Sequence, residues 1–171
     1  MITDISTFLP EDFHPHSRVW IYQSSRQFLI SEAFELEDML KEFLKAWNSH
    51  GVPVKGFANL FHGRFLIFMA DESAGSVSGC STDSSVRLVK EIEKKFKVDL
   101  FDRQLLAFIV KEKIQVLPIS QLKHALENNF IQENDFYFNN LVSTKKELEE
   151  NWIIPLKVSW LSRFLPTDSS N

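Results

Sequence analysis

The stretch from Arg64 to Phe96 constrains the fold more than any other part of this sequence. Residues 64–70 (RFLIFMA) form an apolar run of strand length, and residues 86–96 repeat apolar side chains at helical spacing. The segment between them, 71–85, is rich in serine and contains the only cysteine of the chain. Because a helix N-terminus presents unpaired backbone amides and a partial positive charge, such a loop can hold an anion. The sequence therefore predicts strand, loop and helix here, with the loop as the candidate site.

The apolar pattern along the chain predicts an α+β fold. A helix is expected from Ser31 to a stop at Gly51. Strands are expected at 18–23, 54–61, 64–70, 105–110 and 114–117. The resulting βαββαβ order is typical of a ferredoxin-like start, with a mostly antiparallel sheet and flanking helices. A C-terminal elaboration follows, with a short helix at 120–127, a strand or helix at 136–141 and a helix at 144–152.

Length and composition predict one globular domain over residues 1–171. Hydrophobic residues make up 44% of the chain and charged residues 25%, a balance that allows a sizeable core. Residues 1–17 contain two prolines and are expected to be irregular, and the polar residues 166–171 are expected to form a flexible tail.

Charge and cysteine content exclude several classes of protein. The formal net charge is −4 and the sequence has no basic stripe, which argues against general nucleic-acid binding. One cysteine cannot form an internal disulfide, so the fold needs no oxidising compartment. The N-terminus has no signal-peptide pattern, and the apolar runs are far shorter than the roughly 18–20 residues that span a bilayer. We therefore expect a cytoplasmic protein with no integral membrane segment.

The candidate loop predicts binding of an anion. If Thr82 or Asp83 is the N-cap of the following helix, Ser84 and Ser85 lie in its first turn, and Arg87 adds positive charge. Asp71 and Gly79 lie at the start and middle of the same loop. The structural alternative is that Asp83 caps the helix and satisfies the amides itself.

The same loop allows an enzymatic interpretation. A thiol near a helix N-terminus can have its pKa lowered, so Cys80 is a candidate nucleophile, with Asp71 and Asp83 as carboxylates beside it. Arg87 lies one residue too far from Cys80 for the C-x5-R loop of phosphatases. The alternative is a buried and inert thiol, as most free cysteines are.

Two other segments carry polar side chains that bind ligands in many proteins. Asn139 and Asn140 can bind a polar ligand, or they can close a turn or cap a helix. His14 and His16 offer two imidazoles, but a closed metal site needs further ligands that the sequence does not identify. We therefore include the two asparagines among the candidate ligand-binding residues and predict no metal site and no particular cofactor.

Four segments resemble a small family of bacterial proteins of this length whose members are commonly labelled ABC transporter ATPases. The segments are 18–24 (RVWIYQS), 78–87 (SGCSTDSSVR), 138–142 (FNNLV) and 160–164 (WLSRF). The label implies ATP binding, with Asp71 and Glu72 at the end of a strand that resembles Walker B. The nearest match to the phosphate-binding motif G-x-x-x-x-G-K-[ST] is 51–56, followed by Phe57 and Ala58 where the motif needs lysine and a hydroxyl residue.

These observations lead to one expected function and two alternatives. The first expectation is a non-enzymatic protein that binds a small anion or a protein partner through residues 71–87. The alternatives are a hydrolase that uses Cys80 or carboxylates of the same loop, and an ATPase as the family label implies.

Overall fold

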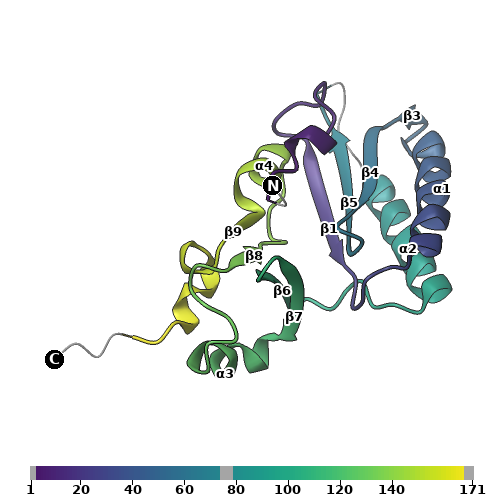
Figure 1. Ribbon diagram of the computed structural model, residues 1–171. Coiled ribbons are helices and arrows are strands. Elements are labelled where there is room, and N and C mark those ends of the chain that lie inside the picture. Colours follow the sequence, from purple (N-terminus) through teal and green to yellow (C-terminus); the bar gives the residue numbers. More distant parts are fainter. Residues whose placement is uncertain (1–2, 74–78, 168–171) are drawn as a thin grey trace. The chain divides into compact units, whose positions relative to one another are not determined.

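The computed structural model describes residues 3–73 and 79–167, with the backbone alone for residues 79–81. Contacts divide the chain into two compact units (Figure 1). Unit 1 contains the residues up to Asp102 together with Asn140–Glu149, and unit 2 contains Arg103–Asn139 and the residues from Glu150 on. Both units combine helices with antiparallel strands, which confirms the predicted α+β class. The expectation of one domain over the whole chain stays a prediction.

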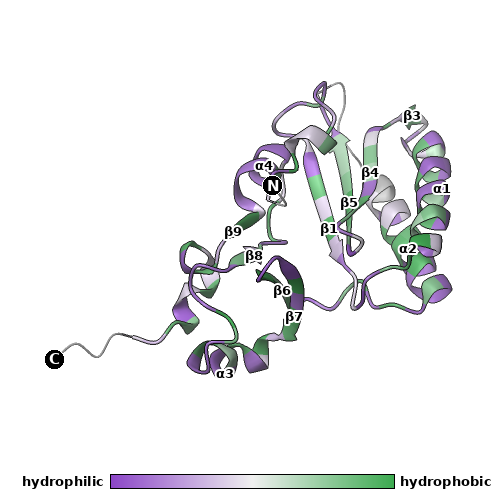
Figure 2. Ribbon diagram, viewed as in Figure 1, coloured by the Kyte–Doolittle hydropathy of each residue, from purple (hydrophilic) through white to green (hydrophobic). Residues whose placement is uncertain are grey.

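Unit 1 is built on a three-stranded antiparallel sheet with the order β1-β5-β4. The strands are β1 (Arg18–Gln23), β4 (Lys55–Phe61) and β5 (Phe65–Asp71), close to the predicted ranges. All residues of the central strand β5 are buried, and Figure 2 shows this strand in the green of hydrophobic residues. A strand covered on both faces needs no alternation of polar and apolar residues, which explains its continuous apolar run.

A tight turn joins β4 and β5, so the predicted strands 54–61 and 64–70 form a hairpin. His62 and Gly63 both have positive φ angles, and the amide of Arg64 donates to the carbonyl of Phe61 at 3.0 Å. Glycine adopts this conformation without steric cost, so Gly63 favours a tight connection at this point.

Two long helices cover one face of this sheet, α1 (Ile30–Ala46) and α2 (Gly79–Phe96) (Figure 1). Their apolar residues and those of β5 form one core. The fully buried members of this core are Leu36, Leu66, Phe68, Val89 and Ile92. Gly51 was expected to stop the first helix, but α1 ends earlier, at Ala46. Gly51 instead lies, with φ of 83°, in the turn between the short strands β2 (Asn48–Ser49) and β3 (Val52–Pro53).

The start of α2 differs from the prediction. The helix begins at Gly79, so Thr82 and Asp83 lie inside it and neither is the N-cap. Glycine, serine, threonine and aspartate are poor helix formers, but tertiary packing of an apolar face supplies most helical stability in proteins. Ser85 is fully buried and precedes Val89 and Ile92 on the same helix face, so this polar residue lies on the packed side of α2.

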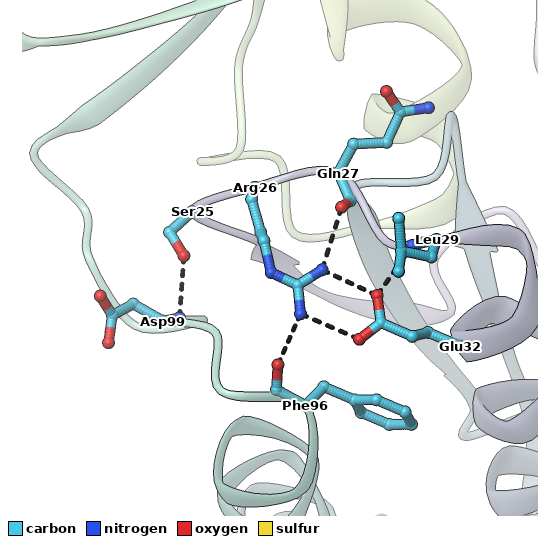
Figure 3. Close-up of polar contacts among 7 residues, drawn as sticks. All are labelled: Ser25, Arg26, Gln27, Leu29, Glu32, Phe96 and Asp99. Atoms are coloured by element: carbon cyan, nitrogen blue, oxygen red, sulfur yellow. Dashed lines mark hydrogen bonds and ion pairs between the residues drawn. The ribbon is translucent and has the colours of Figure 1, made fainter.

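An ion pair joins the N-terminus of α1 to the C-terminus of α2 (Figure 3). The guanidinium of Arg26 donates to both carboxylate oxygens of Glu32 at 2.7 and 2.9 Å, and to the carbonyl of Phe96 at 2.6 Å. Glu32 also accepts a hydrogen bond from the amide of Leu29, the N-cap of α1, at 2.8 Å. Each charge therefore lies at the helix end whose dipole favours it.

Unit 2 contains a four-stranded antiparallel sheet with the order β7-β6-β8-β9. The strands are β6 (Leu105–Val110), β7 (Lys113–Pro118), β8 (Phe136–Phe138) and β9 (Ile153–Pro155). The helix α3 (Leu122–Glu127) packs against this sheet through Leu122, Ala125 and Leu126. The predicted strands at 105–110 and 114–117 and the short helix at 120–127 are confirmed, and the segment 136–141 contains a strand.

The ferredoxin-like expectation is corrected in one respect. The element order matches through β6, but β6 pairs with β7 and β8 in the second sheet and not with β1. The edge of β1, where a fourth strand of a ferredoxin-like sheet would lie, carries another segment. The amide of Val19 donates to the carbonyl of Ser143 at 2.9 Å, and Arg18 forms a β-bridge with Thr144.

The remaining helices are short. They are α4 (Lys145–Asn151) and the 3-10 helices η1 (Ser6–Phe8), η2 (Ile119–Gln121), η3 (Leu156–Val158) and η4 (Trp160–Phe164). Thr144 accepts the amide of Glu147 at 3.2 Å, as the capping-box pattern predicts, whereas the carboxylate of Glu147 accepts from the amide of Ser143. Across residues 3–73 and 79–167, no helix has the length and apolar character to cross a membrane.

The Arg26–Glu32 pair predicts a loss of stability in acid. Hydrogen bonds from Arg26 and from the Leu29 amide lower the pKa of Glu32 from 4.5 to about 2. A carboxyl whose pKa is lower in the folded protein stabilises it above the unfolded pKa, and this stabilisation disappears as the pH falls through the folded value. We expect the free energy of unfolding, measured with urea, to fall as the pH is lowered from 4.5 to 2. In Glu32→Gln the part of this decrease that is due to protonation of Glu32 should be absent.

The control for this experiment is Glu37→Gln. Glu37 forms an exposed pair with Lys41 within α1, at 3.1 Å. This variant should follow the wild-type curve, and the same behaviour from Glu32→Gln would contradict the role assigned to Glu32.

Candidate ligand-binding groove

A groove runs between facing stripes of α1 and α2 in unit 1, and it has a volume of about 490 Å³. We call it the α1–α2 groove. Residues separated by three or four positions share one face of a helix, and both stripes have this spacing. The lining residues are Met39, Glu42, Phe43 and Ala46 of α1, Ser84, Arg87, Leu88 and Glu91 of α2, and Trp47 and Asn48 after α1.

Aromatic side chains make one wall of the groove rigid. Trp47 is only 3% exposed, and its ring lies 5.1 Å from that of Phe43 and 6.2 Å from that of Trp20, between ring centroids. Phe43 in turn makes an edge contact with the buried Phe68 of β5, at 5.8 Å. Such packed aromatic contacts fix the position of the rings, so the apolar surface is largely formed before any ligand arrives.

Gly56 allows Trp47 to occupy this position. A Cβ atom added at Gly56 would lie 2.5 Å from Cε3 and 2.7 Å from Cζ3 of the Trp47 ring. The absence of a side chain in β4 therefore lets the indole pack directly on the strand backbone.

Arg87 and Ser84 bring polar groups to the same groove. They lie one turn apart on α2, and the side chain of Arg87 is exposed. Glu91 follows Arg87 by one turn, and Glu42 lies on α1, where it pairs with Lys45 at 3.0 Å. Within the described residues, no carboxylate lies within ion-pair distance of Arg87. A guanidinium with no ionic partner can form two parallel hydrogen bonds with a carboxylate or phosphate.

The other predicted residues near the start of α2 do not line this groove. Asp83 is exposed, and the hydroxyl of the buried Ser85 donates to the carbonyl of Thr82 at 2.7 Å. Because α2 begins at Gly79, the amides of Ser84 and Ser85 lie beyond its first turn and are not the free amides that the sequence suggested. The side chain of Cys80 lies outside the described part of the chain, and its catalytic role stays a prediction.

Asp71 is placed in a network that fixes the N-terminal segment to the sheet. Its side chain is 3% exposed, accepts from the amides of His14 at 3.1 Å and Ser73 at 2.9 Å, and lies 3.4 Å from Nζ of Lys55. Burial alone would raise the pKa of Asp71, but hydrogen bonds from Ser73, His14 and Lys55 hold that pKa well below its usual range. Its oxygens are thus engaged by the protein itself.

A small second cavity lies beside Asp71, with a volume of about 250 Å³. The rings of His14 and His16 stack there with their centroids 5.4 Å apart, and Glu72 pairs with Arg18 at 3.4 Å. In the described ranges, no group of three histidine, cysteine, aspartate or glutamate side chains is arranged to hold a metal ion.

Asn139 and Asn140 do not line the α1–α2 groove. The amide of Asn139, in unit 2, donates to the carbonyl of Trp152 at 2.6 Å. The side-chain amide of Asn140, in unit 1, donates to Oε1 of Gln23 at 2.9 Å. Both asparagines thus have structural partners, and a ligand-binding role for them stays a prediction.

The sequence pattern does not indicate the α1 side of the groove. Met39 and Phe43 line the groove, but they follow the same helical spacing as the buried core residues Leu36 and Leu40. The apolar pattern therefore does not distinguish a residue of the groove wall from a residue of the core. The segment 51–56, which is the nearest match to the phosphate-binding motif, contains two glycines with structural roles. Gly51 lies in a tight turn, and Gly56 packs against Trp47.

Comparisons with protein families, with curated proteins and with solved structures found no match to this chain.

The packing at Gly56 gives a test of the groove wall. Gly56→Ala should lower the free energy of unfolding by about 1–3 kcal/mol, because overpacking against a fixed ring forces the ring or the strand to move. The measurement is urea unfolding of the single variant and of the same change in a Trp47→Leu background. The cost should be smaller in that background, and an equal cost in both would contradict the contact.

The network around Asp71 gives a second test. Asp71→Ala leaves the amide of His14 and the ammonium of Lys55 without this buried acceptor, so it should lower the unfolding free energy by about 2–4 kcal/mol. Asp83→Ala is the matched control, because Asp83 is exposed, and it should change stability by at most about 0.5 kcal/mol. Equal effects of the two changes would show that the Asp71 contacts do not stabilise the fold.

Proposed function

We propose that the protein binds a small organic anion with an apolar body in the α1–α2 groove, without catalysing a reaction on it. The observation that carries this proposal is the guanidinium of Arg87, which has no ionic partner in the described residues and lies beside a preformed aromatic wall. A carboxylate would bind Arg87 and the hydroxyl of Ser84, while the apolar body packs on Phe43 and Leu88.

The acids of the groove favour a particular class of anion. Glu42 and Glu91 line the same groove as Arg87 and would repel a ligand with several negative charges. The same carboxylates accept hydrogen bonds, which favours a monoanion that also carries a hydroxyl or ammonium group. This composition supports a monocarboxylate over a nucleoside polyphosphate. The setting that we propose for this function is the cytoplasm, as the sequence led us to expect.

A panel of probes tests this proposal through the thermal midpoint of the purified chain. The probes are acetate, inorganic phosphate, 3-phenylpropionate, phenylalanine and Mg·ATP. A ligand at 100 times its Kd adds about 2.7 kcal/mol, which raises the midpoint by several degrees in a chain of this size. We expect 3-phenylpropionate or phenylalanine to raise it, and acetate and phosphate to have little effect. A rise with Mg·ATP alone would instead favour the family label, and no rise with any probe would contradict the proposal.

The role of Arg87 is tested with the probe that binds best. Arg87→Ala should weaken binding by about ten- to a hundredfold, the range for one charge-assisted hydrogen bond, with the thermal midpoint of the free protein nearly unchanged. Lys90→Ala is the matched control, because Lys90 is an exposed cation of α2 that does not line the groove. Equal losses in both variants would indicate a general charge effect and reject the site.

A further inference from the structure

The strand β7 forms an edge of the unit 2 sheet, and part of its backbone has no partner there. Lys111 and Glu112 form the turn before it with positive φ angles, and Val110 pairs with Lys113 across that turn. In a two-residue hairpin the pair that flanks the turn is hydrogen-bonded. Along the strands, hydrogen-bonded pairs then alternate with pairs whose amides and carbonyls point away from each other. The amides and carbonyls of Ile114 and Val116 therefore point away from β6. The structure gives them no backbone partner among the described residues.

A groove of about 940 Å³ lies beside this strand, larger than the α1–α2 groove of about 490 Å³. We call it the β7 groove, and all its lining residues belong to unit 2. They come from the β6–β7 hairpin, from α3 and from the segment that follows α3. Its lining includes Lys113, Gln115, Val116, Leu117, His124, Phe130, Ile131 and Asp135.

The groove follows the backbone of β7. Gln115 and Leu117 point to one face of the sheet, and Val116 points to the other. All three residues line the groove. The groove therefore runs along the part of the strand where the amide and carbonyl of Val116 point away from β6.

The opposite wall is fixed by the end of α3. Asn129 has a positive φ, its amide donates to the carbonyl of Leu126, and the amide of Phe130 donates to the carbonyl of Ala125 at 2.9 Å. This is the bonding pattern of a Schellman motif, which ends the helix in a defined conformation. It places Phe130 at the groove with 67% of the residue exposed. Because full burial of a phenylalanine stabilises a protein by about 1.5–3 kcal/mol, this exposed ring offers apolar surface to a partner.

The charges that line the β7 groove indicate which charges a partner segment would carry. Lys111 and Lys113 line the end near the hairpin turn, and neither forms an ion pair in the part of the chain that the structure describes. The acid of the groove, Asp135, is engaged by the amide of Gln132 at 2.8 Å. A partner segment with acidic side chains at this end would therefore match the unpaired cations.

We propose that the β7 groove binds an extended peptide segment of another protein as an added strand beside β7. Backbone hydrogen bonds to Ile114 and Val116 would hold the segment, as in other complexes in which a peptide extends a sheet. Alternate apolar side chains of the segment would pack on Phe130 and Leu117. Acidic residues at the end near the turn would pair with Lys111 and Lys113. Pro118 has no amide hydrogen, so pairing ends there.

The test is a displayed library of random ten-residue peptides, selected for binding to the full chain. We expect enriched peptides to carry acidic residues at one end and apolar residues at alternate positions. Binding of a synthetic copy should protect the amides of Ile114 and Val116 from hydrogen exchange. It should be weakened more than tenfold by Lys111→Glu with Lys113→Glu. Failure to enrich any peptide, or enriched peptides without acidic residues, would overturn the proposal.

Two backbone changes separate strand addition from simple side-chain contact. Val116→Pro removes an amide that points away from β6, without removing a hydrogen bond to β6, and should abolish binding, whereas Val116→Ala, which keeps the amide, should retain it. N-methylation of alternate residues of the peptide removes its donors without altering the protein, and it should have the same effect even if Val116→Pro fails to fold. Unchanged binding of the N-methylated peptide would overturn strand addition. A dimer of the chain that dissociates in Val116→Pro, seen by sedimentation, would assign the edge to a second copy instead.

Discussion

The contacts of Arg26 connect the ends of α1 and α2, the two helices that share one apolar core with β5 in unit 1. Arg26 precedes α1 but donates to the carbonyl of Phe96, the last residue of α2, while Glu32 accepts from the amide of Leu29, the N-cap of α1. One planar guanidinium thus satisfies polar groups at two helix ends that would otherwise face water or remain unpaired. Glu35 and Lys95 add a more exposed pair between the same helices, at 3.2 Å.

This connection has a consequence for the groove at the other end of the helices. The N-terminus of α1 meets the C-terminus of α2 at Arg26, so the C-terminal half of α1 faces the N-terminal half of α2. The groove residues Phe43 and Arg87 belong to those facing halves. The two helices are therefore joined by an ion pair at one end, while at the other end Phe43 of α1 packs on Phe68 of β5 beside the groove. The apolar core shared by α1, α2 and β5 lies between these two ends.

Local signals allowed much of the fold to be predicted. The strand 18–23 and the hairpins around Gly63 and at 105–118 depend on alternation and on turn residues, which are readable within a few positions. The start of α2 was missed because Gly79–Ser85 has poor helix propensity, and burial of Ser85 on the packed face is a tertiary effect. The allocation of 105–110 to a second sheet depends on pairing with distant strands, for which one sequence carries no signal.

For the candidate site too, some residues were predictable from local sequence, and the role of others depends on distant contacts. Ser84 and Arg87 were predicted as ligand-binding residues and do line a groove, although on the side of a helix and not at its first turn. Asp71 was predicted by its place after an apolar strand, but its oxygens are used by His14, Ser73 and Lys55. The first of these partners lies far away in sequence, and no spacing rule could connect them.

The segment that pairs with the outer edge of β1 makes unit 1 depend on two separate stretches of the sequence. Residues 143 and 144 lie beside this strand, and Lys145 donates its backbone amide to the carbonyl of Ser17 at 2.9 Å and its ammonium to the carbonyl of Phe13 at 3.2 Å. Unit 1 is therefore discontinuous in sequence. A ribosome that has released only the first 102 residues has produced a sheet with an open edge, which is a template for pairing with other chains. Unit 1 becomes complete only after most of unit 2 has been synthesised.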